Sequence, residues 1–315
     1  MQCDRSQSIK RTGASRVIEA IFACCDVLEA GEAFCGHGTD NAWDEAVQLV
    51  LFALGLLPDA PASVGEQSLA EIDIERIDSL LRRRVGERMP LPYVTGEAWF
   101  AGLRFACDNR ALVPRSPLAE LVMAGFCPWY AGNEPLSILD LCCGGGAIGI
   151  AAAVYSPRAS VVLSDVDADA LALASENAVQ HGVSRRVSLV QGDLFAGLAT
   201  DRFDIILCNP PYVDADDLAG MPAEYRHEPP LGLGAGNDGL DLARRILAQA
   251  VNHLNPDGVL LLEVGNSWEA LEATFPRVPF TWVELENGGH GVLAMQTAEL
   301  RESAAALAYT TFPPN

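Results

Sequence analysis

Lysine is almost absent from the sequence, and positive charge is scarce altogether. Lys10 is the only lysine, and 21 basic residues stand against 42 acidic ones, which gives a formal net charge of −21 over 315 residues. A surface this acidic repels nucleic acid and attracts basic partners. The preference for arginine over lysine and the abundance of alanine are equally typical of a GC-rich genome. The charge alone therefore does not decide between a basic partner and compositional drift.

Long apolar runs are also missing. No stretch of about 20 uninterrupted apolar residues occurs, which argues against a membrane-spanning helix. The N-terminal sequence MQCDRSQSIKRTGASR is polar and lacks the apolar stretch of a signal peptide. We therefore expect a cytoplasmic protein without a membrane partner.

The cysteines lack the spacing of a metal or disulfide site. There are nine, an odd number, and no two stand in a Cys-x-x-Cys arrangement. The adjacent pairs Cys24–Cys25 and Cys142–Cys143 are poorly arranged for an ordinary disulfide or for zinc. We therefore expect no metal site and predict reduced, mostly buried cysteines.

The length predicts about two domains of roughly 150 residues each. Residues 1–90 carry apolar residues at helical spacing and no residues that look catalytic, so we expect a helical substrate-recognition domain. Its helices are predicted at Ser15–Ala30, Asp40–Leu57 and Glu75–Pro92. Ser15 and either Asp40 or Asn41 are the predicted N-caps, and Pro90 and Pro92 are expected to end the third helix.

Residues 91–115 alternate apolar and polar positions, with Gly96 and Gly102 at expected turns, which predicts a β-hairpin linker. Strands and helices then alternate through residues 116–300, as in an α/β protein with a mostly parallel sheet covered on both faces. Strands are expected at 137–141, 160–164, 187–191, 203–208, 259–263, 281–284 and 292–295. Helices are expected at 147–155, 167–180, 238–253 and 267–273. Residues 301–315 are expected to form a frayed or loosely docked tail.

A glycine-rich loop follows the first predicted strand of this sheet. Gly144, Gly145, Gly146 and Gly149 stand between that strand and the helix at 147–155. Without side chains the backbone can turn tightly and approach a ligand closely. The N-terminus of the helix adds amide N–H groups, so we predict a cofactor-binding loop.

Asp165 closes the next predicted strand, 21 positions after Gly144. A carboxylate at this point can accept hydrogen bonds from both hydroxyls of a ribose. Read as Gly144-x-Gly146-x-x-Gly149, the loop matches a nicotinamide-dinucleotide fingerprint. Read from Asp140 as Asp-x-x-x-Gly-x-Gly, it resembles the nucleoside loop of S-adenosylmethionine methyltransferases, in which Asp140 would orient the amino-acid part of the cofactor. The loop alone leaves both alternatives open.

A weaker signal follows the strand at 187–191. Asp193 stands where it could accept a hydrogen bond from the exocyclic amine of an adenine, and Leu194 and Phe195 could wall the ring. Aspartate after a strand is also common turn chemistry, so this signal only supports the stronger ones.

The most specific pattern is Asn209, Pro210, Pro211 and Tyr212, directly after the predicted strand Phe203–Cys208. The Asn209 side-chain oxygen and the Pro210 carbonyl can both accept hydrogen bonds from a planar amide or amino nitrogen. The prolines stiffen the loop, and Tyr212 offers a flat face. Because such a nitrogen is a poor nucleophile, catalysis would depend mainly on orientation, and its proton can leave after transfer.

The sequence resembles the S-adenosylmethionine-dependent amino-methyltransferases in DLCCGGGAIGIA and CNPPYV. More specifically, YVTGEAWFAGLRF and VPRSPLAELV resemble the protein-glutamine N5-methyltransferases. GTDNAWDEAVQLVL and PAEYRHEPPLGL resemble the branch of this family that acts on large-subunit ribosomal protein L-three, whereas a second branch acts on peptide-chain release factors. The resemblance implies a class I methyltransferase fold, a Rossmann-like sheet of seven strands with an antiparallel last strand, and methylation of a glutamine side-chain amide.

The resemblance also implies roles for particular residues. Together with the residues above, it predicts cofactor binding by Asp140, Cys143, Gly144, Gly145, Gly146, Ala147, Asp165, Asp193, Leu194 and Asn209. Asn209, Pro210, Pro211 and Tyr212 are the implied catalytic residues, and Arg115 and Glu120 are expected to shape the substrate pocket. Cys142 replaces the first loop glycine of most of the superfamily, and Leu194 replaces an aromatic residue of some release-factor enzymes.

Other functions share some of these features. Nucleic-acid amino-methyltransferases also carry an Asn-Pro-Pro-aromatic loop, but they usually need a basic surface, so no DNA partner is expected. A non-catalytic ribosome-assembly factor would be expected to have lost the glycine loop or the ribose carboxylate, and both are present. We expect the partner to be a basic ribosomal protein, with a release factor as the alternative. His227 is expected to be a structural histidine.

Overall fold

The computed structural model describes residues 8–132, 136–198, 200–286 and 288–308. The chain divides into two compact units. The first is a helical unit formed by the residues up to Ala98 together with Cys107–Asn109 and Pro222–His227, and the second contains the sheet. Assignment of Pro222–His227 to the helical unit was not predicted, because nothing local in the sequence marks it.

The helical unit is built from short helices around an apolar core. They are η1 (Ile9–Arg11), α1 (Val17–Ala30), α2 (Ala42–Ala53), η2 (Ala62–Glu66), α3 (Glu71–Leu81), η3 (Arg82–Gly86) and α4 (Leu91–Thr95). Leu28, Leu49 and Ile77 come from α1, α2 and α3 and are fully buried in one cluster. Helical spacing of apolar residues therefore places one face of each helix in this core.

The predicted cap of the second helix is confirmed, but the start of the first helix and the end of the third differ from the predictions. Asn41 caps α2, and its side chain accepts a hydrogen bond from the Asp44 N–H. Ser15 does not cap α1, which begins at Val17 after Arg16. The expectation that Pro90 and Pro92 end the third helix is wrong. The helix ends in the wider turn η3, and the prolines instead begin α4, where a missing N–H costs nothing.

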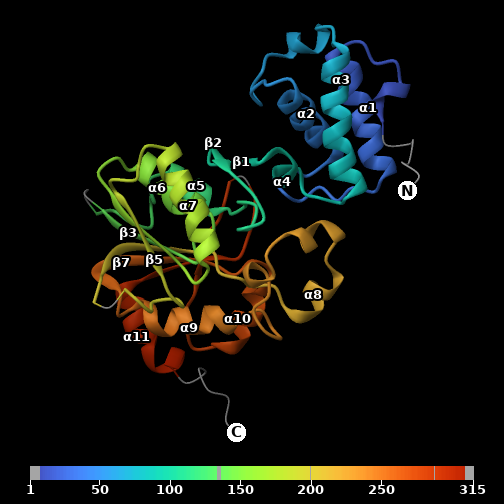
Figure 1. Cartoon of the computed structure of the whole chain (residues 1–315). Helices are drawn as coiled ribbons and strands as arrows, with labels where there is room; N and C mark the ends of the chain where they lie inside the picture. Colours follow the sequence, from blue (N-terminus) through green and yellow to red (C-terminus); the bar gives the residue numbers. More distant parts are fainter. Residues whose placement is uncertain (1–7, 133–135, 199, 287, 309–315) are drawn as a thin grey trace. The chain divides into compact units, whose positions relative to one another are not determined.

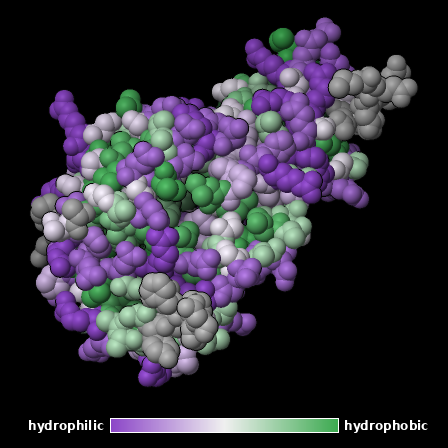
Figure 2. All heavy atoms as spheres, turned by 60° about the horizontal axis from the view of Figure 1, so that its bottom comes forward, coloured by the Kyte–Doolittle hydropathy of each residue, from purple (hydrophilic) through white to green (hydrophobic). Residues whose placement is uncertain are grey.

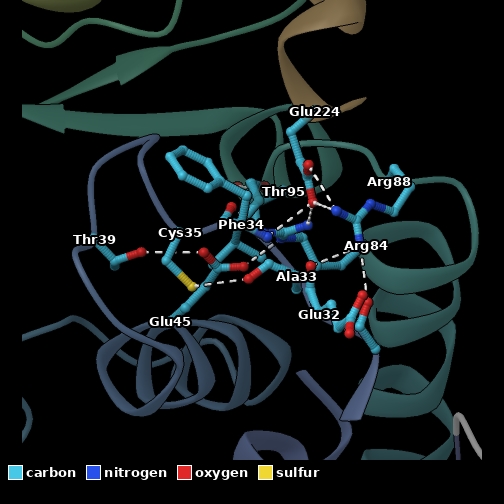
Figure 3. Close-up of polar contacts among 12 residues, drawn as sticks. Glu32, Ala33, Phe34, Cys35, Thr39, Glu45, Arg84, Arg88, Thr95 and Glu224 are labelled. Atoms are coloured by element: carbon cyan, nitrogen blue, oxygen red, sulfur yellow. Dashed lines mark hydrogen bonds and ion pairs between the residues drawn. The ribbon is translucent and has the colours of Figure 1, made fainter. Parts of the chain in front are cut away.

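A buried ion-pair network lies inside the helical unit (Figure 3). Arg84 is 1% exposed, and its guanidinium contacts the carboxylates of Glu45 and Glu224. Its Nη2 also donates to the Phe34 carbonyl at 2.7 Å, while Arg88 donates to Glu224 at 3.1 Å. Burial alone would raise the pKa of Glu224, but the Phe34 N–H and Arg84 hold that pKa below its ordinary value. The network therefore fixes the segment Pro222–His227 within this unit.

Replacing Arg84 with alanine is expected to lower the free energy of unfolding by about 3–5 kcal/mol, because Glu45 would remain buried without this counter-charge and Glu224 would keep only its ion pair with Arg88. The midpoint of urea unfolding followed by circular dichroism measures this loss. Arg76→Ala is the matched control, since Arg76 is exposed and lies 3.9 Å from Asp73. Equal midpoints for the two variants would show that the buried network does not stabilise the unit.

A hairpin precedes the main sheet in the chain. Strands β1 (Glu97–Phe100) and β2 (Leu103–Ala106) pair in a two-stranded sheet, and Gly102 between them has φ +72°. Gly96, before β1, also has positive φ. The predicted turns at both glycines are therefore confirmed.

Among the described residues, seven strands form one sheet in the order β5-β4-β3-β6-β7-β9-β8. The strands are β3 (Ser137–Leu141), β4 (Ser160–Asp165), β5 (Val187–Gln191), β6 (Phe203–Cys208), β7 (Leu254–Glu263), β8 (Thr281–Trp282) and β9 (Val292–Gln296). The first five are parallel, whereas β9 is antiparallel to both β7 and β8. An α/β sheet with an antiparallel last strand is therefore confirmed.

Helices cover both faces of the sheet (Figure 1). The helices α5 (Leu118–Met123), α6 (Ala147–Tyr155) and α7 (Ala168–Gln180) contribute to one buried cluster, and α9 (Asp241–Ala250), α10 (Trp268–Thr274) and α11 (Thr297–Ala308) contribute to the other. The central strands are buried on both sides, as their continuous Ile, Val and Leu runs require. Hydrophilic side chains predominate on the face shown in Figure 2, with hydrophobic ones in small groups between them.

Two expectations for this unit are wrong. Strand β7 begins at Leu254, before Val259, because Leu254 pairs with Phe203 across an irregularity in the register. The C-terminal segment is not frayed through residue 308, because α11 buries Leu300 and Leu307 in the core. Residues 309–315 of the expected tail lie outside the described residues.

The described part of the chain contains no helix long and apolar enough to cross a membrane. All eight cysteines that the structure describes are free thiols, and Cys127 is exposed among them. Within the described ranges no cluster of three or more His, Cys, Asp or Glu side chains is suited to a metal ion.

Candidate active site

The carboxyl ends of β3, β4, β5 and β6 bring most of the predicted cofactor and catalytic residues to one edge of the sheet. Strands β3 and β6 are adjacent and parallel, and Leu141 pairs with Cys208. The glycine loop that follows β3 and the Asn-Pro-Pro-Tyr segment that follows β6 therefore start side by side. Ligands of open α/β sheets bind outside this edge.

The glycine loop is closed onto β4 by hydrogen bonds. The Gly144 N–H donates to Asp165 Oδ2 at 2.8 Å, and the Asp167 N–H donates to Asp165 Oδ1 at 2.9 Å. Gly144 and Gly146 have φ values of +51° and +80°, which glycine adopts without strain. Cys142 also has positive φ, at +59°. The hydrogen bond from the Gly144 N–H to Asp165 therefore holds the glycine loop against the end of β4.

Gly149 allows helix α6 to lie directly against the sheet. A Cβ at this position would lie 2.4 Å from Leu163 and 2.8 Å from the Asp140 side chain, so only glycine fits. The Gly149 N–H donates to Asp140 Oδ2 at 2.7 Å. Close packing and this hydrogen bond together fix the Asp140 carboxylate beneath the loop.

Asp140 is a fully buried carboxylate with one uncompensated oxygen. It is 0% exposed, and its Oδ1 has no hydrogen-bond partner among the described residues. Burial raises its pKa to about 7, against the opposing effect of the Gly149 N–H. An unpaired buried acceptor is costly, and a cationic ligand group is the partner that would satisfy it best.

The residues after β5 have other partners in this structure. Asp193 is exposed and forms an ion pair with Arg245 at 2.7 Å. Leu194 is buried with φ +52°, and Phe195 stacks on His253 with ring centroids 4.5 Å apart. Leu194 is thus held in position, whereas Phe195 contributes its ring to the core.

The Asn-Pro-Pro-Tyr segment is anchored at both ends. Asn209 Nδ2 donates to the Arg115 carbonyl at 3.5 Å, so the amide nitrogen faces that carbonyl and the amide oxygen faces the other way. Pro210 is buried, and Tyr212 Oη donates to Glu263 Oε1 at 3.0 Å. Beyond the segment, Val213 forms a β-bridge with Gly234. Asn209 and Tyr212 therefore have defined orientations in this structure.

Arg115 and Glu120 have structural partners. Arg115 donates two hydrogen bonds of 2.7 Å to the two oxygens of Glu228, which is 2% exposed. The Glu286 N–H donates to Glu120 Oε1 at 2.8 Å. His227 Nε2 lies 2.9 Å from the Glu87 carbonyl inside the helical unit.

Sequence reasoning missed three polar residues beside the segment. Glu228 holds Arg115 and accepts a hydrogen bond from the Val113 N–H, while Glu263 accepts from Tyr212 and Ser116. Glu263 could have been found, because it is the last residue of a predicted buried strand at the carboxyl edge of the sheet. The contact between Ser116 and Glu263 had no local signal, since 147 residues separate them.

Comparison with known proteins finds a matching family and several similar proteins. The family described as methyltransferase small domain matches residues 132–222. The ribosomal protein uL3 glutamine methyltransferase of Xanthomonas campestris pv. campestris is 50% identical over 272 residues, which are 86% of this chain and 88% of that one. The enzyme of the same name from Xylella fastidiosa (strain 9a5c) is 49% identical over 272 residues, 86% of each chain. A solved methyltransferase from Pyrococcus furiosus has a TM-score of 0.45 and 20% identity over 62% of this chain and 89% of that one.

The sheet order, the antiparallel β9 and the glycine loop after β3 define a class I S-adenosylmethionine-dependent methyltransferase. Sequence identity of about one half over most of the chain gives the closer assignment: the chain belongs to the family of ribosomal protein uL3 glutamine methyltransferases. The residues present fit the cofactor, because the buried, unpartnered Asp140 Oδ1 suits its ammonium group. Membership of this family excludes the nicotinamide-dinucleotide alternative, which the loop alone left open.

Proposed function

We propose that the protein transfers the methyl group of S-adenosylmethionine to the side-chain amide nitrogen of a glutamine in ribosomal protein uL3. The observation that carries this proposal is the placement of Asn209 directly after β6, beside the glycine loop after the adjacent strand β3. The products are N5-methylglutamine and S-adenosylhomocysteine. A ribosomal-protein substrate is made in the cytoplasm, and we propose that the enzyme acts there.

The residues proposed to hold the cofactor follow β3, β4 and β5. Asp140 Oδ1 would accept from the ammonium group, and Asp165, whose oxygens each take one backbone hydrogen bond, keeps acceptor capacity for the ribose hydroxyls. Asp193 and Leu194 would lie at the adenine. The Asp193 carboxylate would then either leave Arg245 or bind Arg245 and the adenine amine together. Bound S-adenosylmethionine supplies an electrophilic methyl group on a sulfonium.

The residues proposed to act on the substrate are those after β6. An amide nitrogen is a poor nucleophile because its lone pair is delocalised into the carbonyl. The Asn209 side-chain oxygen and the Pro210 carbonyl accept hydrogen bonds from its N–H groups and fix its direction, while Tyr212 provides a flat surface for the amide plane. Orientation is the main catalytic contribution of these residues, and the proton leaves to solvent after transfer.

The acidic composition supports a basic protein as the substrate. The enzyme has a formal net charge of −21, and ribosomal proteins that bind RNA are basic. Opposite charge raises the rate of encounter, and added salt screens it. The rate of methylation at low substrate concentration should therefore fall as ionic strength rises.

Methyl transfer from radiolabelled S-adenosylmethionine to purified uL3 tests the proposal directly. We expect incorporation into uL3 with a mass increase on one glutamine, and much slower incorporation into a purified release factor. Faster transfer to the release factor would show that the release factor, and not uL3, is the preferred substrate. Absence of transfer to either protein would contradict the proposal.

A further inference from the structure

Tyr212 is held at three points by the last residue of β7 and by residues that directly follow this strand. Its hydroxyl donates to Glu263 Oε1 at 3.0 Å, and its carbonyl accepts from Ser267 Oγ at 3.0 Å. Between these residues, a Cβ on Gly265 would lie 2.5 Å from the Tyr212 ring. We call Glu263, Gly265 and Ser267 the tyrosine clamp.

The backbone of the tyrosine clamp is itself tightly packed. Gly265 has φ +48°, and a Cβ on Gly291 would lie 2.1 Å from the Gly265 carbonyl oxygen. The Val264 N–H donates to the Gly291 carbonyl at 2.7 Å. The ring of Tyr212 therefore rests on backbone that has little room to move.

The carboxylate of Glu263 also contacts the segment opposite Asn209. Ser116 Oγ donates to Glu263 Oε2 at 2.6 Å, and the neighbouring Arg115 carbonyl accepts from Asn209 Nδ2. One carboxylate thus connects Tyr212 with the stretch of backbone that orients Asn209. Glu263 is only 3% exposed, so these two hydroxyls are its hydrogen-bond donors in place of water.

We propose that Glu263 is a positioning residue for methyl transfer, which fixes the Tyr212 ring and through it the plane of the substrate amide. The inference rests on the proposed function for the identity of the acceptor. A buried carboxylate is a costly choice for packing alone, whereas two converging hydroxyls explain why an acceptor of two hydrogen bonds stands here.

The protonation state of Glu263 gives this contact a signature of its own. Burial raises its pKa to about 7, against the hydroxyls of Ser116 and Tyr212 and the charge of Arg115. The charge of Glu263 also acts on Cys208, whose thiol pKa burial raises far above its ordinary value. Below pH 7 the protonated acid becomes a donor at one oxygen, so the hydroxyl at that oxygen must accept a hydrogen bond where it donated one before.

Two measurements test the inference. In the full chain labelled with [13Cζ]-tyrosine, the resonance lost in Tyr212→Phe should titrate near pH 7 and should stop titrating in Glu263→Gln. In steady-state kinetics with uL3, Glu263→Gln should lower kcat by about tenfold, in the range of one hydrogen bond to a charged group, with little change in the affinity for S-adenosylmethionine. In a Tyr212→Phe background the same substitution should have almost no effect on kcat.

Glu272→Gln is the matched control, because this exposed carboxylate accepts from Trp282 Nε1 at 2.7 Å on the same unit. A Tyr212 resonance unaffected by Glu263→Gln would overturn the inference, as would an equal loss of kcat with and without the Tyr212 hydroxyl. Failure of the unmodified enzyme to methylate uL3 would contradict the proposed function instead, and the resonance would still decide whether Glu263 holds Tyr212.

Discussion

Replacing Asn209 with alanine is expected to lower kcat for methylation of uL3 by about 10²- to 10³-fold, the usual effect of removing one preorganised hydrogen-bonding group. The structure already orients the Asn209 amide through the Arg115 carbonyl, so its oxygen faces away from that contact. The loss should appear in kcat more than in the affinity for S-adenosylmethionine, because the substrate amide would still bind but in varied orientations. Rapid-quench kinetics and calorimetry measure the two quantities separately.

Two further variants make this result specific. Asn252→Ala removes an exposed asparagine from the same unit and should leave kcat unchanged. Asn209→Asp keeps an acceptor oxygen but places a carboxylate against the Arg115 carbonyl, so it should fall between the wild type and alanine. If Asn209→Ala methylated uL3 at the normal rate, the proposal that Asn209 orients the substrate amide would be wrong.

Replacing Asp140 with asparagine is expected to weaken binding of S-adenosylmethionine while it stabilises the cofactor-free protein at pH 8. The loss of a hydrogen bond to a charged group corresponds to about 1.5–3 kcal/mol, or roughly tenfold to a hundredfold in Kd. The gain in stability follows from burial, which raises the pKa of Asp140 to about 7. The two effects have opposite signs, so a simple loss of folding cannot mimic them.

The pH dependence follows from the direction of the pKa shift. Between the ordinary pKa of an aspartate and about 7, the folded chain binds more protons at Asp140 than the unfolded chain does. The free energy of unfolding of the wild type therefore falls as pH rises through this range. Asp140→Asn has no titrating group at this position. Its Tm should therefore exceed that of the wild type most at pH 8, and the difference should shrink toward pH 4. Asp201→Asn, at an exposed aspartate, is the control, and an Asp140→Asn advantage independent of pH would contradict the assignment.

Most of the sheet could be predicted because its strands carry local signals. Ser137–Leu141 and Phe203–Cys208 are apolar runs bounded by turn residues, and both were predicted at the bounds that the structure gives. Leu254–Glu263 was predicted too short, because Pro256 and Gly258 lie inside it and resemble a turn. Leu254 nevertheless pairs with Phe203 of the neighbouring strand β6, so β7 extends through these residues. The sequence of β7 alone does not show this pairing.

The site could be predicted in part for the same reason. Asp140, Asp165 and Asn209 each stand at a strand end, and parallel pairing of β3 with β4 and β6 brings those ends together. Their contacts with a cofactor or substrate stay predictions. Glu263 stands at an equivalent end but was not recognised, because a single glutamate after an apolar run has no motif around it. Its role depends on Ser116 and Tyr212, which are far away in the sequence.

The position of Glu224 limits how the protein can be recombined with its relatives. Glu224 belongs to the helical unit, although it follows the Asn-Pro-Pro-Tyr segment in the chain. A chimera that exchanges only the residues before Ala98 would bring in new counterparts of Arg84 and Arg88 without their matching acid. Exchange of the whole helical unit between relatives therefore needs two grafts, one N-terminal and one at Pro222–His227, made together.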